Sequence, residues 1–327
     1  MPAEHTDLDW ASVTQALLDL GIGKLYENAD LRQCSRWRIG GRASLLVEPS
    51  SIDALASLKQ FLCAKQIPHL VIGDGANLLF DDAGVEGVVI RLGKSLSGIR
   101  VDGDLLSVDA GVWVPRLAHA SLLAGLTGLE HIVGIPGTVG GLVCMNGGSQ
   151  RRGIGDNVVD VTAVDGNGDV IRLDASECGF AYRTSRFQSG LTVAACTLRL
   201  QPGDKKAIRR EMLEILHSRR TRFPLKLPNC GSVFVSNPAM YDLVGPPGKA
   251  IELVGLKGVR RGGARVSPQH ANFIVNEGNA SSTDVLTLIA DIRSEVHKQT
   301  GYWMESEVRY VAPNCSIFPA HCAKEMT

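Results

Sequence analysis

The segment from Gly125 to Gly148 constrains the fold of this chain more than any other, because it is both rich in glycine and strongly apolar. Glycine-rich segments are usually flexible polar linkers. Here half of the residues between the glycines are leucine, isoleucine or valine, and the only carboxylate and imidazole are those of Glu130 and His131. Apolar side chains are stabilised by burial, and glycine lets the backbone turn sharply or approach a neighbour closely. We therefore expect a buried, folded-back loop against a large flat partner, which is either a cofactor ring or another part of the chain.

The length and charge of the chain exclude several classes of protein. Its 327 residues are enough for two domains. The 34 basic and 34 acidic side chains give a formal net charge of zero, whereas general nucleic-acid binding relies on excess positive charge. No apolar run reaches the ~20 residues of a membrane helix, and none follows a basic N-terminal start as in a signal peptide. We expect a cytoplasmic protein without nucleic-acid or membrane partners, and the sequence implies no particular oligomer.

The eight cysteines do not follow the spacing of a metal site. None forms a CxxC pair, and none stands at zinc-ligand spacing from histidines. Small core gaps in cytosolic proteins are commonly filled by reduced cysteines. We therefore expect free thiols and no metal.

Hydrophobic periodicity and turn residues predict a mixture of short strands and helices. Strands that do not alternate regularly with helices favour an α+β fold over a doubly wound parallel sheet. Hairpins are predicted at 99–112 and 157–173, where turn residues separate two apolar runs. Helices are predicted over 9–20, 52–64, 115–124, 205–222 and 282–300, and further strands over 43–47, 67–72, 88–92, 191–200, 271–276 and 302–311.

The domain boundary is predicted at Pro202-Gly203-Asp204, which interrupts the strand pattern before an amphipathic helix. The resulting division has four parts: an N-terminal helix and lead-in at 1–34, a two-lobed domain at 35–201, a second domain at 205–311, and a tail at 312–327.

A predicted strand runs directly into the sequence Gly73-Asp74-Gly75-Ala76-Asn77-Leu78. A strand followed by GxG is found where backbone amides bind a pyrophosphate. The complete GxGxxG motif fails here, because Leu78 occupies its last glycine position and no clear helix follows. From spacing alone the segment is either a β-turn or an anion-binding loop.

The sequence Gly134–Gly141 (GIPGTVGG), followed by Met145-Asn146-Gly147-Gly148, closely resembles the flavin-binding loop of the UDP-N-acetylenolpyruvoylglucosamine reductase family. Other matches follow in the same order from about Arg38 to Tyr310. The resemblance implies the FAD-binding domain shared with vanillyl-alcohol oxidase and p-cresol methylhydroxylase, followed by a C-terminal α+β substrate domain whose last strand returns to the N-terminal lobe.

The same resemblance implies FAD as the bound cofactor and NADPH as the hydride donor. It assigns the residues after the first strand to the FAD pyrophosphate and those of the glycine-rich loop to the rest of the cofactor. The first set is Gly73, Gly75, Ala76, Asn77 and Leu78; the second is Gly134, Ile135, Pro136, Gly137, Thr138, Gly140, Gly141, Asn146 and Gly147. Ala76 stands where the family commonly has serine.

Three catalytic residues are implied by the family motifs: Arg183 in Y-R-x-S, Ser232 in G-S-x-F, and Glu307 in a segment similar to E-P-E-V-R. Without the resemblance, these residues read as a solvated arginine, a turn serine and one of several charges on an exposed strand face. A guanidinium stays charged and can give two hydrogen bonds to a carboxylate. The resemblance makes Arg183 and Glu307 stabilise the intermediate and Ser232 the general acid, with Glu305 the weaker carboxylate candidate.

Substrate-binding residues are implied at Tyr182, Arg222, Asn237, Lys249 and His270. The short stretch from Tyr182 to Leu200 resembles the subclass without an extra tyrosine-bearing substrate loop. The sequence departs from the family at 34–37 and 149–152, and Ser306 replaces a proline, from which we expect a slightly looser strand.

The implied function is reduction of UDP-N-acetylglucosamine enolpyruvate to UDP-N-acetylmuramate, a precursor of peptidoglycan in the bacterial cell wall. Two alternatives stay open. One is a flavoenzyme of the same fold that acts on another nucleotide sugar or small substrate, as an oxidase or a reductase. The other is a non-catalytic protein that binds a flavin or a nucleotide sugar.

Overall fold

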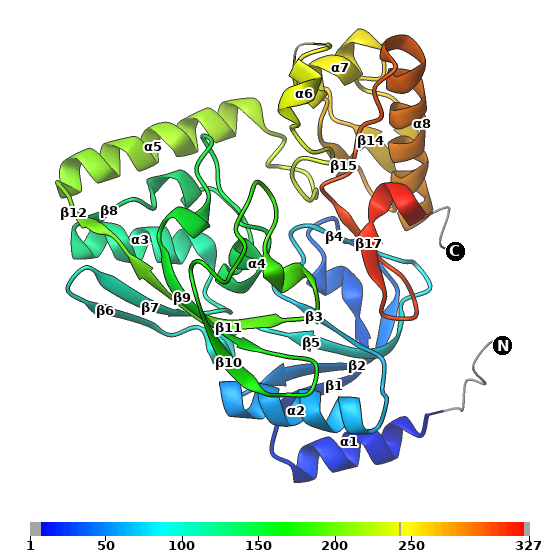
Figure 1. Cartoon of the computed structure of the whole chain (residues 1–327). Helices are drawn as coiled ribbons and strands as arrows, with labels where there is room; N and C mark the ends of the chain where they lie inside the picture. The colour runs from blue at the N-terminus through cyan, green and yellow to red at the C-terminus, as the bar shows by residue number, and fades with distance from the viewer. Residues whose placement is uncertain (1–7, 242, 324–327) are drawn as a thin grey trace. The chain divides into compact units, whose positions relative to one another are not determined.

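The computed structural model describes residues 8–241 and 243–323, which form two compact units (Figure 1). Residues 1–7 and 324–327 lie outside the described residues. The first range belongs to the predicted segment 1–34, where no signal peptide was expected, and the second belongs to the predicted tail. The first unit comprises the described residues up to Ala29, together with Ser44–Gly73 and Gly87–Leu216; the second comprises Asp30–Ala43, Asp74–Glu86 and the described residues from His217 onward.

The first unit contains two main sheets, with strand orders β1-β2-β5-β3 and β10-β9-β11-β7-β6, and a small sheet of β8 and β12. Its helices and strands are α1 (Trp10–Asp19), β1 (Gly23–Asp30), β2 (Arg42–Pro49), α2 (Ile52–Ala64), β3 (His69–Ile72), β5 (Val85–Arg91), η2 (Lys94–Leu96), β6 (Ile99–Asp102), β7 (Leu105–Asp109), α3 (Val114–Ala124), β8 (Leu126–Thr127), η3 (Glu130–Ile132), α4 (Val139–Cys144), η4 (Ile154–Asp156), β9 (Val158–Val164), β10 (Val170–Asp174), η5 (Arg186–Gln188), β11 (Thr192–Arg199), β12 (Gln201–Pro202) and α5 (Lys205–Arg222), along which the chain passes into the second unit.

Helix α2 has the bounds predicted from the sequence, and its cap and buried face explain why. Ser51 is the N-cap, and its Oγ accepts the N–H of Ala54 at 3.0 Å, which satisfies one of the free donors at the helix start. Leu55, Leu58 and Leu62 lie at helical spacing and are fully buried.

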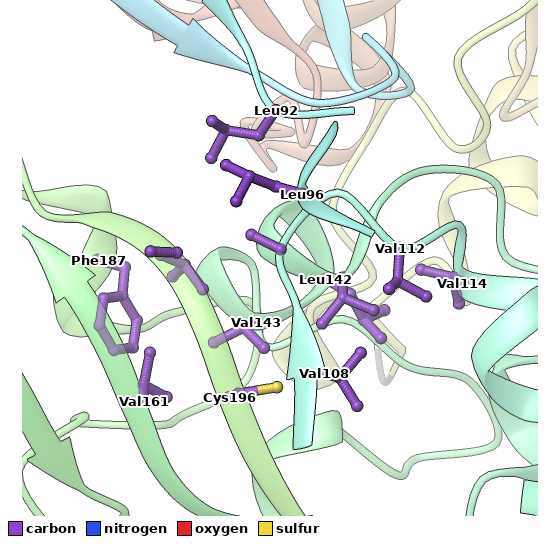
Figure 2. Close-up of a cluster of buried hydrophobic side chains, with 14 of the residues drawn as sticks. Leu92, Leu96, Val108, Val112, Val114, Leu142, Val143, Val161, Phe187 and Cys196 are labelled. Atoms are coloured by element: carbon purple, nitrogen blue, oxygen red, sulfur yellow. The ribbon is translucent and has the colours of Figure 1, made fainter. Parts of the chain in front are cut away.

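The five-stranded sheet contains both predicted hairpins. β9 and β10 pair in antiparallel register, with Val164 opposite Val170 and Asp160 opposite Asp174. β6 and β7 form the second hairpin. Helix α4 packs on this sheet, and Figure 2 shows its Leu142 and Val143 among the buried side chains of Val108 and Cys196 from β7 and β11. The glycine-rich segment therefore stands on the main core of the first unit.

The second unit contains two three-stranded sheets, with orders β13-β14-β15 and β17-β16-β4. β16 pairs with β4 in parallel, and Arg309, Tyr310 and Val311 lie opposite Leu78, Leu79 and Phe80. Its elements are η1 (Leu31–Cys34), β4 (Leu78–Phe80), α6 (Pro238–Tyr241), α7 (Pro247–Leu253), β13 (Arg260–Arg261), β14 (Ala264–Val266), β15 (Ile274–Asn276), α8 (Ser282–Thr300), β16 (Arg309–Val311), β17 (Ile317–Pro319) and η6 (Ala320–Cys322).

Helix α8 has the bounds predicted from the sequence, 282–300, and its N-cap is Ser281. The Ser281 Oγ accepts the N–H of Asp284, and the Asp284 carboxylate accepts the N–H of Ser281, both at 3.0 Å. Gly301 ends the helix with a φ of +74°, the left-handed conformation that glycine adopts without strain.

The predicted strand over 302–311 is wrong for most of its length, since β16 begins only at Arg309. Ser306 forms an isolated β-bridge with Phe234. The N–H of Ser306 donates a hydrogen bond to the side chain of His321 and not to a neighbouring strand. Glu305, Glu307 and Arg309 therefore do not share one face of a continuous strand.

The predicted tail at 312–327 is also wrong as far as the structure describes it. Residues 317–319 form β17, which pairs with β16, and η6 follows directly. The central glycine-rich loop likewise contains regular structure, the turn η3 and the helix α4. None of the helices in the described part of the chain combines the length and apolar character needed to cross a membrane.

Candidate active site

The glycine-rich loop lies against the connection between β7 and α3 through a run of backbone hydrogen bonds. Val139 and Gly140 donate to the carbonyl oxygens of Val112 and Ala110, both at 2.8 Å. A Cβ built on Gly140 would lie 2.9 Å from the Cβ of Ala110, so this close approach requires glycine. The glycine at position 140 therefore serves protein packing.

The end of β3 meets the same loop. A Cβ built on Gly73 would lie 2.1 Å from the Thr138 Oγ1, a separation that no real Cβ contact adopts. Gly73 and Thr138, which the resemblance assigns to the cofactor from two different segments, are thus adjacent in the first unit. Gly141 is different: it is exposed, and its nearest Cβ neighbour would be Thr138 Oγ1 at 3.9 Å. A loop with uncharged side chains and an open glycine fits a large planar cofactor such as the isoalloxazine ring of FAD.

Asn146 joins the glycine-rich loop to the segment that carries Arg183. Its Nδ2 donates to the carbonyl oxygen of Ala181, and its Oδ1 accepts the N–H of Gly155, both at 2.9 Å. Nearby, the Ser185 Oγ donates to the carbonyl oxygen of Cys144 at 2.6 Å. The predicted cofactor loop and the predicted catalytic arginine are therefore held together within one unit.

Arg183 stands at the tip of a tight turn. Ala181 and Thr184 exchange two backbone hydrogen bonds of 3.0 and 3.1 Å across it. The φ of Arg183 is +54°, in the left-handed region that costs a non-glycine residue roughly 1–2 kcal/mol. Such strain at a functional residue is typical of a preorganised site. Tyr182, beside it, is 58% exposed, and the guanidinium carbon of Arg183 lies 5.8 Å from its ring centre.

The second unit carries the other segment that the sequence predicts to bind the cofactor, residues 75–78. Gly75 has a φ of +58°, and a Cβ there would lie 1.8 Å from the carbonyl oxygen of Cys34. The Asn77 side chain donates to the carbonyl oxygen of Glu307 at 2.9 Å, and the Asn77 carbonyl oxygen accepts the N–H of Arg309 at 3.0 Å. Asn77 thus bonds the chain segment that carries Glu307.

Ser232 and Glu307 lie on two segments of the chain that are hydrogen-bonded to each other. The N–H of Glu307 donates to the carbonyl oxygen of Val233 at 2.8 Å, and the N–H of Val235 donates to that of Glu305 at 2.9 Å. Gly231, with a φ of +80°, forms the turn before Ser232. The backbone therefore places the two predicted catalytic side chains within one small region of the second unit.

The thiol of Cys230, two residues before Ser232, lies against the segment of residues 75–78. It donates to the carbonyl oxygens of Leu78 at 3.5 Å and Gly75 at 3.6 Å. Burial raises the pKa of this thiol to about 12. None of the eight cysteines, all of which lie within the described residues, forms a disulfide.

Asn272, to which the sequence analysis gave no role, supports the segment that follows Ser232. Its side chain is 5% exposed and holds Phe234 at both backbone groups, accepting the N–H at 2.9 Å and donating to the carbonyl oxygen at 3.0 Å. Its own carbonyl oxygen accepts the N–H of Val233 at 2.9 Å. The signal was present as the asparagine of His270-Ala271-Asn272-Phe273, since an asparagine in an apolar run needs buried hydrogen-bond partners.

His270, a predicted substrate residue, is packed between aromatic rings. Its ring centre lies 5.4 Å from that of Phe223 and 5.0 Å from that of Phe273. Burial lowers the pKa of His270, and the positive charge of Arg222 lowers it further. The other three predicted substrate residues of this unit, Arg222, Asn237 and Lys249, are exposed.

The two segments that depart from the family motifs are both well anchored. The indole nitrogen of Trp37, which is fully buried, donates to the carbonyl oxygen of Ile274 at 2.7 Å, and Asn276 donates to the carbonyl oxygen of Trp37 at 2.9 Å. The Ser149 Oγ donates to the carbonyl oxygen of His131 at 2.5 Å.

The fold and these two sets of residues define a flavoprotein with an FAD-binding domain and a separate C-terminal domain. Family models match both: an FAD-binding domain over residues 43–174, and the C-terminal domain of UDP-N-acetylenolpyruvoylglucosamine reductase over residues 223–311. The α+β class and the FAD cofactor predicted from the sequence are thereby confirmed.

Curated relatives agree over nearly the whole chain. UDP-N-acetylenolpyruvoylglucosamine reductase 1 of Corynebacterium glutamicum is 49% identical over 292 residues, which cover 89% of this chain and 87% of the relative. Reductase 2 of Symbiobacterium thermophilum is 40% identical over 288 residues, or 88% of this chain and 92% of the relative. The crystal structure of the reductase from Thermus caldophilus matches with a TM-score of 0.74 and 32% identity, over 88% of this chain and 98% of that one. The chain belongs to the UDP-N-acetylenolpyruvoylglucosamine reductase family.

Proposed function

We propose that this protein reduces UDP-N-acetylglucosamine enolpyruvate to UDP-N-acetylmuramate in peptidoglycan precursor synthesis, with NADPH as the hydride donor. The relatives that carry the name of this activity cover most of the chain. Because NADPH and nucleotide sugars are cytoplasmic metabolites, we place the reaction in the cytoplasm.

The observation that carries the assignment of residues is the backbone pairing of Val233 with Glu307, which puts Ser232 and Glu307 on adjacent segments. The anchoring of the Arg183 turn to the glycine-rich loop supports the third residue. Bound FAD supplies hydride transfer, from NADPH to the enolpyruvyl methylene carbon of the substrate.

The three side chains have complementary tasks in this reaction. Hydride addition leaves negative charge on the carboxylate-bearing part of the substrate. The Arg183 guanidinium binds that group with two donors and stays charged as the negative charge grows. Glu307, on the segment that pairs with Val233 next to Ser232, is the second residue that stabilises this intermediate. The Ser232 hydroxyl gives its proton to the carbon next to the new C–H bond, which completes addition of two hydrogens to the double bond.

We also propose that the five residues named as substrate-binding in the sequence analysis contact the substrate. Tyr182 adjoins Arg183, while Arg222, Lys249, Asn237 and His270 offer positive charge and hydrogen bonds for the nucleotide diphosphate and sugar. Neutral His270 fits this task, because its lowered pKa keeps the imidazole uncharged at pH 7.

Turnover with substrate and NADPH tests the proposal directly. The purified protein should carry FAD and should consume NADPH only when UDP-N-acetylglucosamine enolpyruvate is present, with UDP-N-acetylmuramate identified by mass spectrometry. Sustained oxygen consumption with another sugar nucleotide would instead indicate an oxidase of the same fold. Bound FAD that NADPH does not reduce would indicate a non-catalytic binding protein.

A further inference from the structure

The C-terminal segment from residue 312 to 323 lies beyond the last residue, 311, that the family model of the C-terminal domain covers. It turns back on the chain: β17 pairs antiparallel with β16, and Val311, Tyr310 and Arg309 lie opposite Ile317, Phe318 and Pro319. Phe318 is buried against Tyr310, with ring centres 5.5 Å apart. Because of this pairing, η6 and its residue His321 lie next to the segment that carries Glu307.

His321 and Ser306 are joined by reciprocal hydrogen bonds. The N–H of Ser306 donates to the Nδ1 of His321 at 3.0 Å, and the N–H of His321 donates to the Ser306 Oγ at 3.2 Å. Ser306 is 6% exposed, so water competes little for these groups. Because a backbone N–H can only donate, Nδ1 must be the acceptor, and the proton of the neutral ring is on Nε2. Ser306, which stands in place of the family's proline, thus supplies both a donor and an acceptor to His321.

Glu307 is fixed on both sides by this arrangement. On its C-terminal side, the carbonyl oxygen of Val308 accepts the N–H of Ala320 at 2.9 Å and the Ser306 Oγ at 3.1 Å. The backbone groups of Glu307 itself bond Val233 and Asn77. The backbone of residues 306–308 is thus bound to Val233, Asn77, Ala320 and His321, although the segment belongs to no strand.

We propose that His321 is a positioning residue for Glu307 and acts through Ser306. This inference rests on the proposed catalytic role of Glu307. A side chain on an irregular segment takes its direction from the backbone hydrogen bonds next to it, and a misplacement of about 1 Å at a reacting group can cost ~10²-fold in rate. The C-terminal segment therefore serves the reaction without touching the substrate.

The test compares His321→Leu with His321→Asn in the two halves of the reaction under anaerobic conditions. Leucine removes the acceptor, whereas the asparagine Oδ1 stands close to the place of Nδ1 and restores it. We expect His321→Leu to slow reoxidation of the reduced protein by substrate about 10-fold or more, on the scale of such misplacement. Reduction by NADPH should be unchanged, and His321→Asn should recover most of the lost rate. His217→Leu, which removes an exposed histidine of α5, is the matched control.

Two outcomes overturn the inference: equal loss in the asparagine and leucine variants, which indicates a merely structural role, or a normal rate in the leucine variant. Glu307→Gln separates these outcomes from failure of the proposed function. If Glu307→Gln reoxidises normally, the assignment of Glu307 is wrong; if it is slow while His321→Leu is normal, only the inference about His321 fails. In a Glu307→Gln background, His321→Leu should have little further effect, because both changes act on the same group. As a readout independent of activity, the nitrogen-15 shifts of His321 should show the Nε2–H tautomer, and an Nδ1–H tautomer would contradict the proposal.

Discussion

The side-chain amide of Asn77 donates a hydrogen bond of 2.9 Å to the carbonyl oxygen of Glu307, a residue 230 positions further along the chain. The backbone of Asn77 bonds the same segment, because its carbonyl oxygen accepts the N–H of Arg309. The residue that the family motif assigns to FAD therefore also holds the backbone of Glu307. We propose that Asn77 couples FAD binding to the position of Glu307.

Asn77→Asp should weaken this coupling, since a carboxylate facing a carbonyl oxygen has no proton to donate. An unsatisfied, partly buried acceptor costs about 1–3 kcal/mol of the free energy of unfolding. Urea unfolding of the protein measures this difference. Asn279→Asp is the control, because Asn279 is exposed with a φ of +55°, where aspartate is also tolerated. Equal stability losses in the two variants would contradict the role of Asn77.

Gly73→Ala should disrupt the contact between β3 and the glycine-rich loop, because its Cβ would overlap the Thr138 Oγ1. We expect a lower thermal midpoint and less FAD retained, measured by flavin absorbance per protein. Thr138→Ala removes the overlapping oxygen, so the double variant should recover part of the loss of stability. Gly166→Ala is the control, since no atom lies within 4 Å of its Cβ position. Strictly additive effects of the two changes would show that Gly73 and Thr138 do not meet.

Asn272→Leu should unpair both backbone groups of Phe234 in a buried place. Each unsatisfied group costs about 1–3 kcal/mol, so the free energy of unfolding should fall by roughly 2–6 kcal/mol. Denaturant unfolding gives this value, and substrate-driven reoxidation should slow as the Ser232 loop loses its support. Asn167→Leu, in the exposed turn between β9 and β10, should change stability far less. If Asn272→Leu lowered the free energy of unfolding no more than Asn167→Leu does, the bridging role of Asn272 would be wrong.

His131 should make the protein less stable in mild acid. It is 1% exposed, and neither ring nitrogen has a hydrogen-bond partner among the described residues. Burial lowers the pKa of His131, and Arg152 lowers it further, against smaller opposite effects of Asp156 and Glu130. Because the folded-state pKa lies below the unfolded value of about 6.5, the unfolded state binds the proton more readily, and stability falls as the pH drops below that value.

His131→Phe removes this titration. Its stability relative to the wild type should therefore rise as the pH is lowered from about 7.5 to about 5.5, around the ordinary histidine pKa. Thermal midpoints of both proteins across this range provide the measurement. His217→Phe, at an exposed position, should show no such trend. A constant difference between His131→Phe and wild type would mean that His131 does not titrate in this way.

Local sequence signals predicted the elements that depend on their own residues. Ser51 and a leucine repeat define α2, and the turn around Gly166 to Gly168 defines the β9–β10 hairpin. The flavin loop was recognised because its motif is long and unusual. α4 was not predicted inside that loop, because glycine is a poor helix former and only packing on β7 and β11 stabilises the helix.

Elements that depend on distant partners could not be predicted from local sequence. β1 has a polar sequence, GKLYENAD, without an apolar alternation, and it forms by pairing at the edge of a sheet. The residues after 311 were predicted to be a tail because their sequence contains no signal for pairing with β16. The segment from Glu305 to Glu307 was predicted to be a strand, but the N–H of Ser306 donates to the side chain of His321 instead of to a neighbouring strand. In each case a contact between residues far apart in the chain decides the local structure.

The most direct measurement is an anaerobic comparison of wild type and Ser232→Ala, because it separates the two halves of the proposed reaction. Wild type should lose its flavin absorbance on addition of NADPH and regain it on addition of UDP-N-acetylglucosamine enolpyruvate. Ser232→Ala should bleach at the same rate and recover ~10²–10⁴-fold more slowly, the usual contribution of a positioned proton donor. Equal losses in both halves, or recovery of Ser232→Ala at the wild-type rate, would contradict the role of Ser232. A wild-type protein that bleaches and never recovers with this substrate would contradict the proposed function itself.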